Sequence, residues 1–220
     1  MPSEPKVFAV VPAWNEAPEI GAVVSALRPH VSAVIVVDDG SADATAAAAR
    51  AAGADVLRHD INRGQGAALV TGMRWALMKG ADVIVTFDAD GQHRAEDLAS
   101  LVDPVIQGRA DVALGSRFLD RASNVPPLRR LLLRAAVLFT RLTTGLRLTD
   151  AHNGFRAFSR SALSGLRLTQ DRMAHASEIL SEIARLRLRH VEVPVTVRYT
   201  EYSRAKGQST LGAFRVLLDL

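Results

Sequence analysis

The chain has 220 residues, of which 48% are hydrophobic, so it can bury one sizeable core, and a largely disordered protein is excluded. Cysteine is absent, which excludes disulfides and thiolate metal sites and fits a reducing cytoplasm. The formal net charge is +4, and no apolar run reaches ~18 residues, so we expect no membrane-spanning helix. We also expect no secretory signal, because the N-terminus carries an acid before its apolar stretch.

The first 116 residues alternate short apolar strands with amphipathic helices. The pattern predicts strands at 6–12, 33–39, 54–59, 82–88 and 111–116, and helices near 18–29, 41–52, 65–79 and 95–107. For the second helix we expect Ser41 as the N-cap and Gly53 as the C-terminal stop. Apolar strands separated by helices indicate an α/β fold with a mostly parallel central sheet and helices on both faces.

The second half of the chain is less regular. A long helical pattern follows the two prolines in "NVPPLRR", and then come a strand-like "GFRAFSR", a helix near 173–187 and a strand at 190–199. A polar stretch, "TEYSRAKGQST", follows that strand. No repeat and no low-complexity linker divides the halves, so the sequence predicts a single domain.

Polar and glycine-rich residues follow each predicted strand of the first half. The stretches are "PAWNE", "DDGS", "HDINRGQGAA", "DADGQ" and "GSR", in chain order. In an open α/β sheet, ligands bind beyond the carboxyl ends of the strands. One polar loop would be ordinary, but five in succession predict a ligand site at this edge.

Two aspartates end the fourth predicted strand, in "VIVTFDADGQH". Residues two apart in an extended segment point the same way, so Asp88 and Asp90 can face one ion while Ala89 packs behind them. Their hard oxygens suit Mg²⁺ or Mn²⁺, and Gln92 could add a neutral oxygen. The alternative is a surface turn that Asp90 begins and Asp88 caps, and His93 is as consistent with a turn as with a ligand.

Positive charge is concentrated between Arg117 and Leu148, where seven arginines stand against one acid. From Leu128 to Leu148 apolar residues interleave with five of these arginines, which is typical of a basic amphipathic helix at an anionic membrane surface. The alternative is an ordinary helix that packs its leucines on the sheet.

Taken in order, the motifs "PAWNE", "DDGS", "NRGQGAA", "DADGQ", "GSR", "GFRAF" and "RAKGQST" resemble glycosyltransferase family 2, and within it the polyprenyl-phosphate sugar synthases. The resemblance covers nearly the whole chain. It implies one GT-A domain, with a Rossmann-like nucleotide-sugar half at 1–116 and an acceptor half at 117–220. It also implies inverting transfer of a hexose from a nucleotide sugar, of GDP-mannose or UDP-glucose type, to a polyprenyl phosphate.

The resemblance also assigns roles to individual positions. The nucleotide sugar would be bound by Pro12, Ala13, Asn15, Glu16, Asp39, Asn62, Arg63, Gly64, Asp88, Ala89, Arg204 and Lys206. The metal, Mg²⁺ or Mn²⁺, would be held by Asp88, Asp90 and Gln92. The acceptor phosphate would be held by Arg117 and by Arg129 or Arg130, so that Asp90 and Arg117 are the implied catalytic residues.

A phosphate acceptor needs no general base, because its second pKa near ~6 leaves it mostly dianionic at neutral pH. A hydroxyl acceptor would need one, and Glu178 or Asp150 is then the candidate. That rival is a family 2 enzyme acting on a saccharide or another soluble hydroxyl. A sugar nucleotidyltransferase is a more distant alternative, and a binding module would leave the carboxylate pair without a task.

Many members of the family continue into transmembrane helices, which the sequence to Leu220 does not contain. We therefore expect a cytoplasmic protein attached peripherally to the inner face of the cell membrane. The attachment would come from its own anionic-lipid-binding surface or from a small membrane-protein partner. The expected ligands are a nucleotide sugar and a polyprenyl phosphate, with no nucleic acid.

Overall fold

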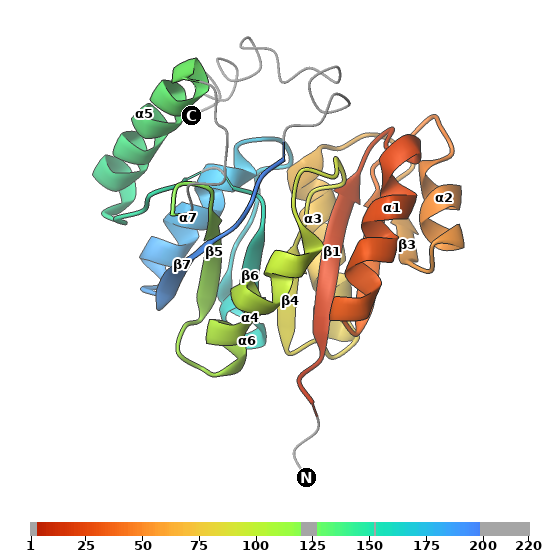
Figure 1. The fold of residues 1–220 in the computed structure, drawn as a ribbon, viewed down its shortest axis with the longest axis horizontal. Coiled ribbons are helices and arrows are strands. Elements are labelled where there is room, and N and C mark those ends of the chain that lie inside the picture. The colour runs from red at the N-terminus through yellow and green to blue at the C-terminus, as the bar shows by residue number, and fades with distance from the viewer. Residues whose placement is uncertain (1–3, 120–126, 152, 199–220) are drawn as a thin grey trace.

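The computed structural model describes residues 4–119, 127–151 and 153–198, and for residues 127–129 it describes only the backbone. A seven-stranded sheet has the order β3-β2-β1-β4-β6-β5-β7 (Figure 1). Strand β6 runs antiparallel to both of its neighbours, and the other pairings are parallel. The strands are β1 (Val7–Ala13), β2 (Ala33–Asp38), β3 (Asp55–Arg58), β4 (Val83–Thr86), β5 (Val112–Ser116), β6 (Arg156–Ser159) and β7 (His190–Pro194).

Helices cover both faces of the sheet (Figure 1). One face carries α1 (Ala17–Leu27), α2 (Thr45–Ala51) and α4 (Leu98–Ile106), and the other carries α3 (Gln65–Met78), α6 (Arg160–Gly165) and α7 (His175–Arg185). Short 3₁₀ turns lie at η1 (Arg28–His30) and η2 (Ala95–Asp97). Helix α5 (Pro127–Thr144) contacts α7 at the side of the domain.

The alternation of side chains along β1 supplies both halves of the core. Val7, Ala9 and Val11 belong to the hydrophobic cluster beneath α1, α2 and α4. Phe8 and Val10 belong to the cluster beneath α3, α6 and α7. A strand buried on both faces must be apolar at successive positions, which is why β1 shows no polar alternation.

Every element predicted in the first half is present, but one helix begins later and one strand ends earlier than predicted. Helix α2 begins at Thr45, where Asp43 Oδ1 accepts a hydrogen bond from the Thr45 backbone nitrogen at 3.0 Å. Ser41 is therefore not its N-cap, and the Ser41 hydroxyl instead accepts from the Asn15 backbone nitrogen at 2.9 Å. Gly53, with φ +93°, follows the end of the helix as expected.

Two strands are shorter than the sequence predicted. Strand β4 ends at Thr86, and residues 89–91 form a turn in which Gly91 has a φ of +68°. Strand β7 ends at Pro194, one residue before the Val195 backbone nitrogen makes a last hydrogen bond to the Ser116 carbonyl at 3.0 Å. Strand β6, from the second half, lies between β4 and β5, so both halves build one sheet in one α/β domain. The division at residue 116 into a nucleotide half and an acceptor half stays a prediction.

Candidate active site

The ends of β1, β2 and β4 meet at one edge of the sheet. Ala13 pairs with Asp38 at the end of β2, and the Asp39 backbone nitrogen donates to the Ala13 carbonyl at 2.8 Å. Glu16, just beyond β1, lies close enough to Asp90, beyond β4, for its charge to act on the Asp90 carboxyl. The predicted ligand-binding edge is therefore assembled from loops that are far apart in the sequence.

Asp39 is buried and holds the loop that leads into α3. Its two carboxylate oxygens accept from the backbone nitrogens of Arg63 at 3.0 Å and Gly64 at 2.7 Å. The same carboxylate contacts His59 Nδ1 at 2.7 Å. The observed task of Asp39 is to fix this loop, and its contact with a nucleoside stays a prediction, as do those of Asn62 and Arg63, which lie at the surface.

The loop after β1 is fixed in a similar way. Asn15 adopts a φ of +53°, and its Oδ1 accepts from the Ala42 backbone nitrogen at 2.9 Å. The Glu16 backbone nitrogen donates to Thr45 Oγ1 at 2.8 Å. Pro12 and Ala13 are buried residues of β1, so the exposed parts of the loop begin after them.

Asp88 is held through both oxygens, by one side chain from α3 and by one from its own loop. Gln65 Nε2, at the start of α3, donates to Asp88 Oδ1 at 3.0 Å. His93 Nε2 lies 3.2 Å from Asp88 Oδ2, and its ring packs against Phe87 and Phe155. His93 therefore positions an aspartate and is itself fixed by aromatic packing.

Asp90 lies in the turn beyond β4, where its Oδ1 accepts from the Gln92 backbone nitrogen at 3.1 Å. The expectation of an extended 88–90 segment was thus wrong, because the chain turns at Ala89, although Ala89 is buried behind the carboxylates as expected. The two carboxylates still interact. Burial, and after it the negative charge of Asp88, raise the pKa of Asp90 to about 6.

Asp88 titrates in the opposite direction. Burial acts to raise its pKa, but the hydrogen bond and charge of His93 and the charges of His175 and Arg156 outweigh burial, so the pKa lies below its ordinary value. The surroundings thus stabilise the ionised form of Asp88 and destabilise the ionised form of Asp90. Such a pair gains free energy when a cation binds between the two charges.

A buried cation lies behind this pair. The Arg156 guanidinium donates to backbone carbonyls, with Nε 2.9 Å from the Asn153 oxygen. Burial lowers the pKa of Arg156 to about 10, and the charges of Asp88 and Asp150 act in the other direction. Arg156 is therefore still charged at neutral pH, and it lies close enough to Asp88 and Asp150 for their charges to act on it.

Arg117 lies beyond β5 and pairs with Asp150. Its Nε is 2.6 Å from Asp150 Oδ2, and its backbone nitrogen donates to the same oxygen at 3.2 Å. The two side chains are 6% and 0% exposed. Glu192 Oε1 accepts from the Asp150 backbone nitrogen at 3.1 Å and supports the pair from β7. Asp150 thus has a cation to hold, which leaves it poorly suited to act as a base.

Residues 8–167 match the model of the family described as Glycosyl transferase family 2. The chain belongs to this family. It is 38% identical over 220 residues to the uncharacterized protein MJ1222 of Methanocaldococcus jannaschii, a match that covers 98% of this chain and 90% of the relative. It is 33% identical to the UDP-N-acetylglucosamine–dolichyl-phosphate N-acetylglucosaminyltransferase of Methanococcus voltae (97% and 94% covered), and 35% identical to the undecaprenyl-phosphate mannosyltransferase of Micrococcus luteus (91% and 87% covered).

The fold of this glycosyltransferase has solved counterparts. Glucosyl-3-phosphoglycerate synthase from Mycobacterium tuberculosis, crystallised with Mn²⁺, UDP and glucosyl-3-phosphoglycerate, superposes with a TM-score of 0.71 at 23% identity. The match covers 98% of this chain and 80% of that one. The GT-A fold expected from the sequence is thereby confirmed.

The family's metal-binding role can be tested against the side chains present. Among the residues that the structure describes, no three His, Asp or Glu side chains form a metal-ligand group. Mg²⁺ usually takes only one or two protein carboxylates, together with water and substrate phosphates. Two mutually repelling carboxylates fit that requirement. Beside them, the buried Gln92 amide has an Nε2 without a hydrogen-bond partner, so the amide can turn to present Oε1, the atom that can bind a cation. Asp88, Asp90 and Gln92 are therefore compatible with a divalent ion.

Several other candidate residues lie outside the described part of the chain or make contacts other than those predicted. Arg204 and Lys206 lie outside the described residues, as does the side chain of Arg129, while Arg130 is exposed on α5. Glu178 accepts hydrogen bonds on both carboxylate oxygens from Thr169 and Gln170. It is therefore engaged in holding a loop, and its role as a base stays a prediction.

The sequence did not predict three of the residues that surround Asp88. Gln65, Gly154 and Arg156 contact it or act on it, and they come from two distant segments that only the fold brings to it, whereas His93 lies five residues further along the same loop. The glycine in "GFRAF" was a signal, since a glycine can mark a place where the backbone closely approaches another group.

The close approach of the Gly154 backbone to the Asp88 carboxylate can be tested by substitution. A Cβ at Gly154 would lie 2.5 Å from Asp88 Oδ2 and 2.8 Å from Oδ1, which is shorter than any tolerated contact. Gly154→Ala should displace the Asp88 carboxylate and lower sugar transfer at least about 100-fold, since small misplacements of catalytic groups cost that much. Steady-state rates measure this, with Gly21→Ala as the control, since a Cβ at Gly21 meets nothing within 4 Å. Equal rates for Gly154→Ala and wild type would contradict the placement of Asp88.

Proposed function

We propose that the protein is an inverting, metal-dependent hexosyltransferase that transfers sugar from a nucleotide sugar to a polyprenyl phosphate. The observation that carries this proposal is the similarity, over most of both chains, to enzymes named for sugar transfer to dolichyl or undecaprenyl phosphate. The polarised pair Asp88 and Asp90 supports a divalent ion at the donor, and Arg117 supports a phosphate at the acceptor.

The difficult part of the reaction is the negative charge that grows on the departing nucleoside diphosphate. A divalent ion held by Asp88, Asp90 and Gln92 would supply Lewis-acid stabilisation of that charge. The chain itself orients the carboxylates through Gln65 and His93, and the buried Arg156 adds a fixed positive charge behind them. The bond from the anomeric carbon to the diphosphate oxygen breaks, and its electron pair leaves with the nucleoside diphosphate.

The acceptor phosphate forms the new bond from the opposite face of the sugar, which inverts the anomeric centre. A phosphate monoester is already an anion at neutral pH and loses no proton in this step. The chain must hold and orient it, and the guanidinium of Arg117 is suited to that, because its planar fork matches phosphate oxygens. Asp150 fixes the orientation of this guanidinium through Nε.

One assay tests the function. Purified protein is incubated with Mg²⁺ or Mn²⁺, a panel of nucleotide sugars and a short-chain polyprenyl phosphate, and released nucleoside diphosphate is measured. We expect turnover with one donor that requires both metal and lipid phosphate and is lost in Asp90→Ala. Turnover unaffected by lipid phosphate would indicate a hydroxyl acceptor. Pyrophosphate release from a nucleoside triphosphate and a sugar phosphate would indicate a nucleotidyltransferase.

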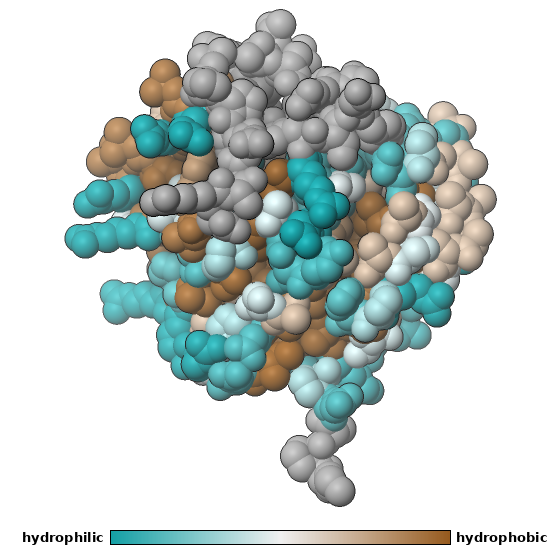
Figure 2. Space-filling model, viewed as in Figure 1, coloured by the Kyte–Doolittle hydropathy of each residue, from teal (hydrophilic) through white to brown (hydrophobic). Residues whose placement is uncertain are grey.

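Helix α5 supports a location at the inner membrane face. Ala136 and Thr140 are buried toward the domain, whereas Leu131, Leu138 and Leu142 are 65%, 57% and 77% exposed. In Figure 2, hydrophobic and hydrophilic atoms lie next to one another over this helix. Exposed arginines flank the leucines, and the stretch 127–149 has no acidic residue. None of the helices in the described ranges is both long and apolar enough to cross a bilayer.

An anionic lipid surface is therefore the proposed occupant of the exposed α5 face. Each arginine near such a surface contributes about 1 kcal/mol, so Arg134→Gln with Arg141→Gln should weaken binding to phosphatidylserine vesicles about 30-fold. Vesicle co-sedimentation at low and high salt measures this. The matched control is Arg50→Gln with Arg74→Gln, which removes two exposed arginines from α2 and α3. Equal weakening in both pairs would mean that net charge, and not α5, governs the binding.

A further inference from the structure

The segment 166–174 is fastened to α7 along its length. Glu182 Oε2 accepts from the Arg167 backbone nitrogen at 2.8 Å near its start. Glu178 holds its middle, accepting from the Thr169 backbone nitrogen at 2.9 Å, the Thr169 hydroxyl at 2.7 Å and the Gln170 backbone nitrogen at 3.0 Å. Two acids, one helical turn apart, thus fix a loop that has no secondary structure of its own.

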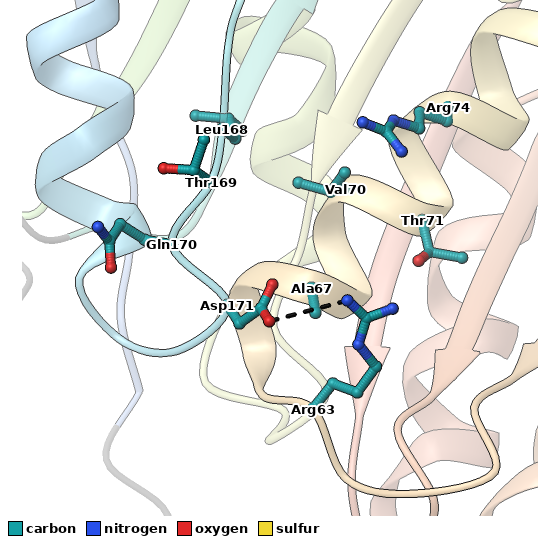
Figure 3. A pocket seen from close by; sticks show the side chains of 9 residues that line it. All are labelled: Arg63, Ala67, Val70, Thr71, Arg74, Leu168, Thr169, Gln170 and Asp171. Atoms are coloured by element: carbon teal, nitrogen blue, oxygen red, sulfur yellow. Dashed lines mark ion pairs between the residues drawn. The ribbon is translucent and has the colours of Figure 1, made fainter.

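The other side of this segment presses on the N-terminal end of α3. The Asp171 carbonyl accepts from the Ala67 backbone nitrogen at 3.0 Å. A Cβ at Gly64 would lie 2.4 Å from that carbonyl oxygen, and one at Gly66 would lie 2.1 Å from the Gln170 carbonyl oxygen. Figure 3 shows residues 168–171 passing alongside α3. An ion pair between Arg63 and Asp171, with a nitrogen–oxygen distance of 3.7 Å, joins the two segments. The two glycines therefore permit a backbone contact that any side chain would block.

Gln65 lies between these two glycines and reaches the donor carboxylates. Its Nε2 donates to Asp88 Oδ1 at 3.0 Å. The neighbouring Gly64 backbone nitrogen donates to Asp39 Oδ2 at 2.7 Å. The short stretch 64–66 thus touches both of the aspartates expected to serve the nucleotide sugar, and the 166–174 segment is what it rests on.

We propose that Glu178 is a positioning residue of the donor site. It holds the 166–174 segment against Gly64 and Gly66, and so sets where Gln65 places the Asp88 carboxylate. This inference rests on the proposed function, because it presumes that Asp88 serves a nucleotide sugar. It replaces the interpretation of Glu178 as a general base, since both of its oxygens already accept hydrogen bonds from the segment it holds.

The two roles predict different kinetics for Glu178→Gln. A glutamine places an NH₂ donor against backbone N–H donors at residues 169 and 170, so the segment loses its anchor. A positioning role raises the dissociation constant of the donor nucleotide about 10-fold, as is usual for residues one step behind the site. A base role would leave nucleotide binding unchanged and lower the turnover number instead.

The experiment is a double-mutant cycle read out by calorimetric titration of UDP and GDP in the presence of Mn²⁺. Glu178→Gln and Gln65→Ala should each weaken the nucleotide that wild type binds by about 10-fold. Because both act on the placement of Asp88, the double variant should lose no more than about 20-fold, well short of the product of the two losses. Thr169→Val, which removes only the hydroxyl contact to Glu178, should show a smaller loss in the same direction.

Arg189→Gln is the matched control, because Arg189 lies at the surface beside β7, where its side chain pairs with Asp111 at 2.7 Å and donates to the Gly108 carbonyl. It should bind nucleotide as wild type does, and thermal melts of all variants show which of them remain folded. Multiplicative losses in the cycle, or a Glu178→Gln variant with unchanged affinity, would overturn the inference. Wild type that binds neither nucleotide would instead contradict the proposed function.

Discussion

Asp90→Asn is expected to stabilise the metal-free protein at pH 7.5 and to abolish sugar transfer. The pKa of Asp90 is raised from its ordinary value of 3.8 to about 6. The folded protein therefore either binds a proton at Asp90 or carries a buried negative charge there that is repelled by Asp88. Between pH 4 and pH 6 the folded state binds more protons than the unfolded state, and the free energy of unfolding falls as the pH rises. Above pH 6 the loss is complete and amounts to about 3 kcal/mol.

Asparagine has no charge to lose, so the variant should not show this fall. At pH 7.5 its melting temperature should exceed that of wild type, by about 2–4 °C for each kcal/mol gained. Differential scanning calorimetry in EDTA from pH 4 to pH 8 measures it. Adding Mn²⁺ should then raise the melting temperature of wild type far more than that of the variant, because only wild type keeps both carboxylates for the ion.

Asp88→Asn is the control with the opposite sign. The pKa of Asp88 is lowered by His93, His175 and Arg156 in spite of burial, so its ionised form stabilises the fold above pH 4 and that contribution is lost as the pH falls. Asp88→Asn should therefore lower the melting temperature at pH 7.5. Two aspartates two residues apart would then shift stability in opposite directions. Stabilisation by both substitutions, or by neither, would contradict the assigned electrostatics.

The sequence predicts the sheet well because each strand has its own local signal. β1 reads as seven apolar residues since both of its faces are buried, and Gly53 ends α2 since it can adopt a positive φ. The strand order was beyond the sequence, because β6 reaches its place between β4 and β5 from far along the chain. At residues 89–91 the sequence favoured an extended segment over a turn, and hydrogen bonding by Asp90 decides for the turn.

The carboxylates of the site were visible in the sequence, but their environment was not. Asp88 and Asp90 follow a strand directly, which marks them for an edge site. Gln65 carries no pattern of its own, because a hydrogen bond across 23 residues depends on how α3 meets the loop after β4. His93 was noticed in the sequence, but its role was left open between a turn residue and a ligand. Glu178 shows the converse: a polar residue on an amphipathic helix looks available until its partners in the loop are known.

Arg117→Met and Asp150→Leu are each expected to destabilise the protein strongly. The two side chains are 6% and 0% exposed, and removing either one leaves a buried charge without its partner at a cost of about 3–5 kcal/mol. The double variant removes both charges, so its loss should be about 2–3 kcal/mol smaller than the sum of the single losses. Urea unfolding measures all three. Transfer to polyprenyl phosphate should be lost in each variant that stays folded, because each removes or reorients the proposed phosphate-holding guanidinium.

The Asp103–Arg109 ion pair is the exposed control, which shows how much of the loss of stability comes from burial of the Arg117–Asp150 pair. Its oxygen–nitrogen distance is 2.7 Å, close to the 2.6 Å of the buried pair, but the side chains of Asp103 and Arg109 are 49% and 59% exposed. Water screens such a pair, so Arg109→Met should cost less than about 1 kcal/mol and leave transfer unchanged. If Arg117→Met cost no more than Arg109→Met, the Arg117 pair would be open to water. In that case Arg117 could not have the role proposed for it. Binding of the acceptor phosphate by Arg117 requires that Asp150 hold the guanidinium rigidly in a site without water.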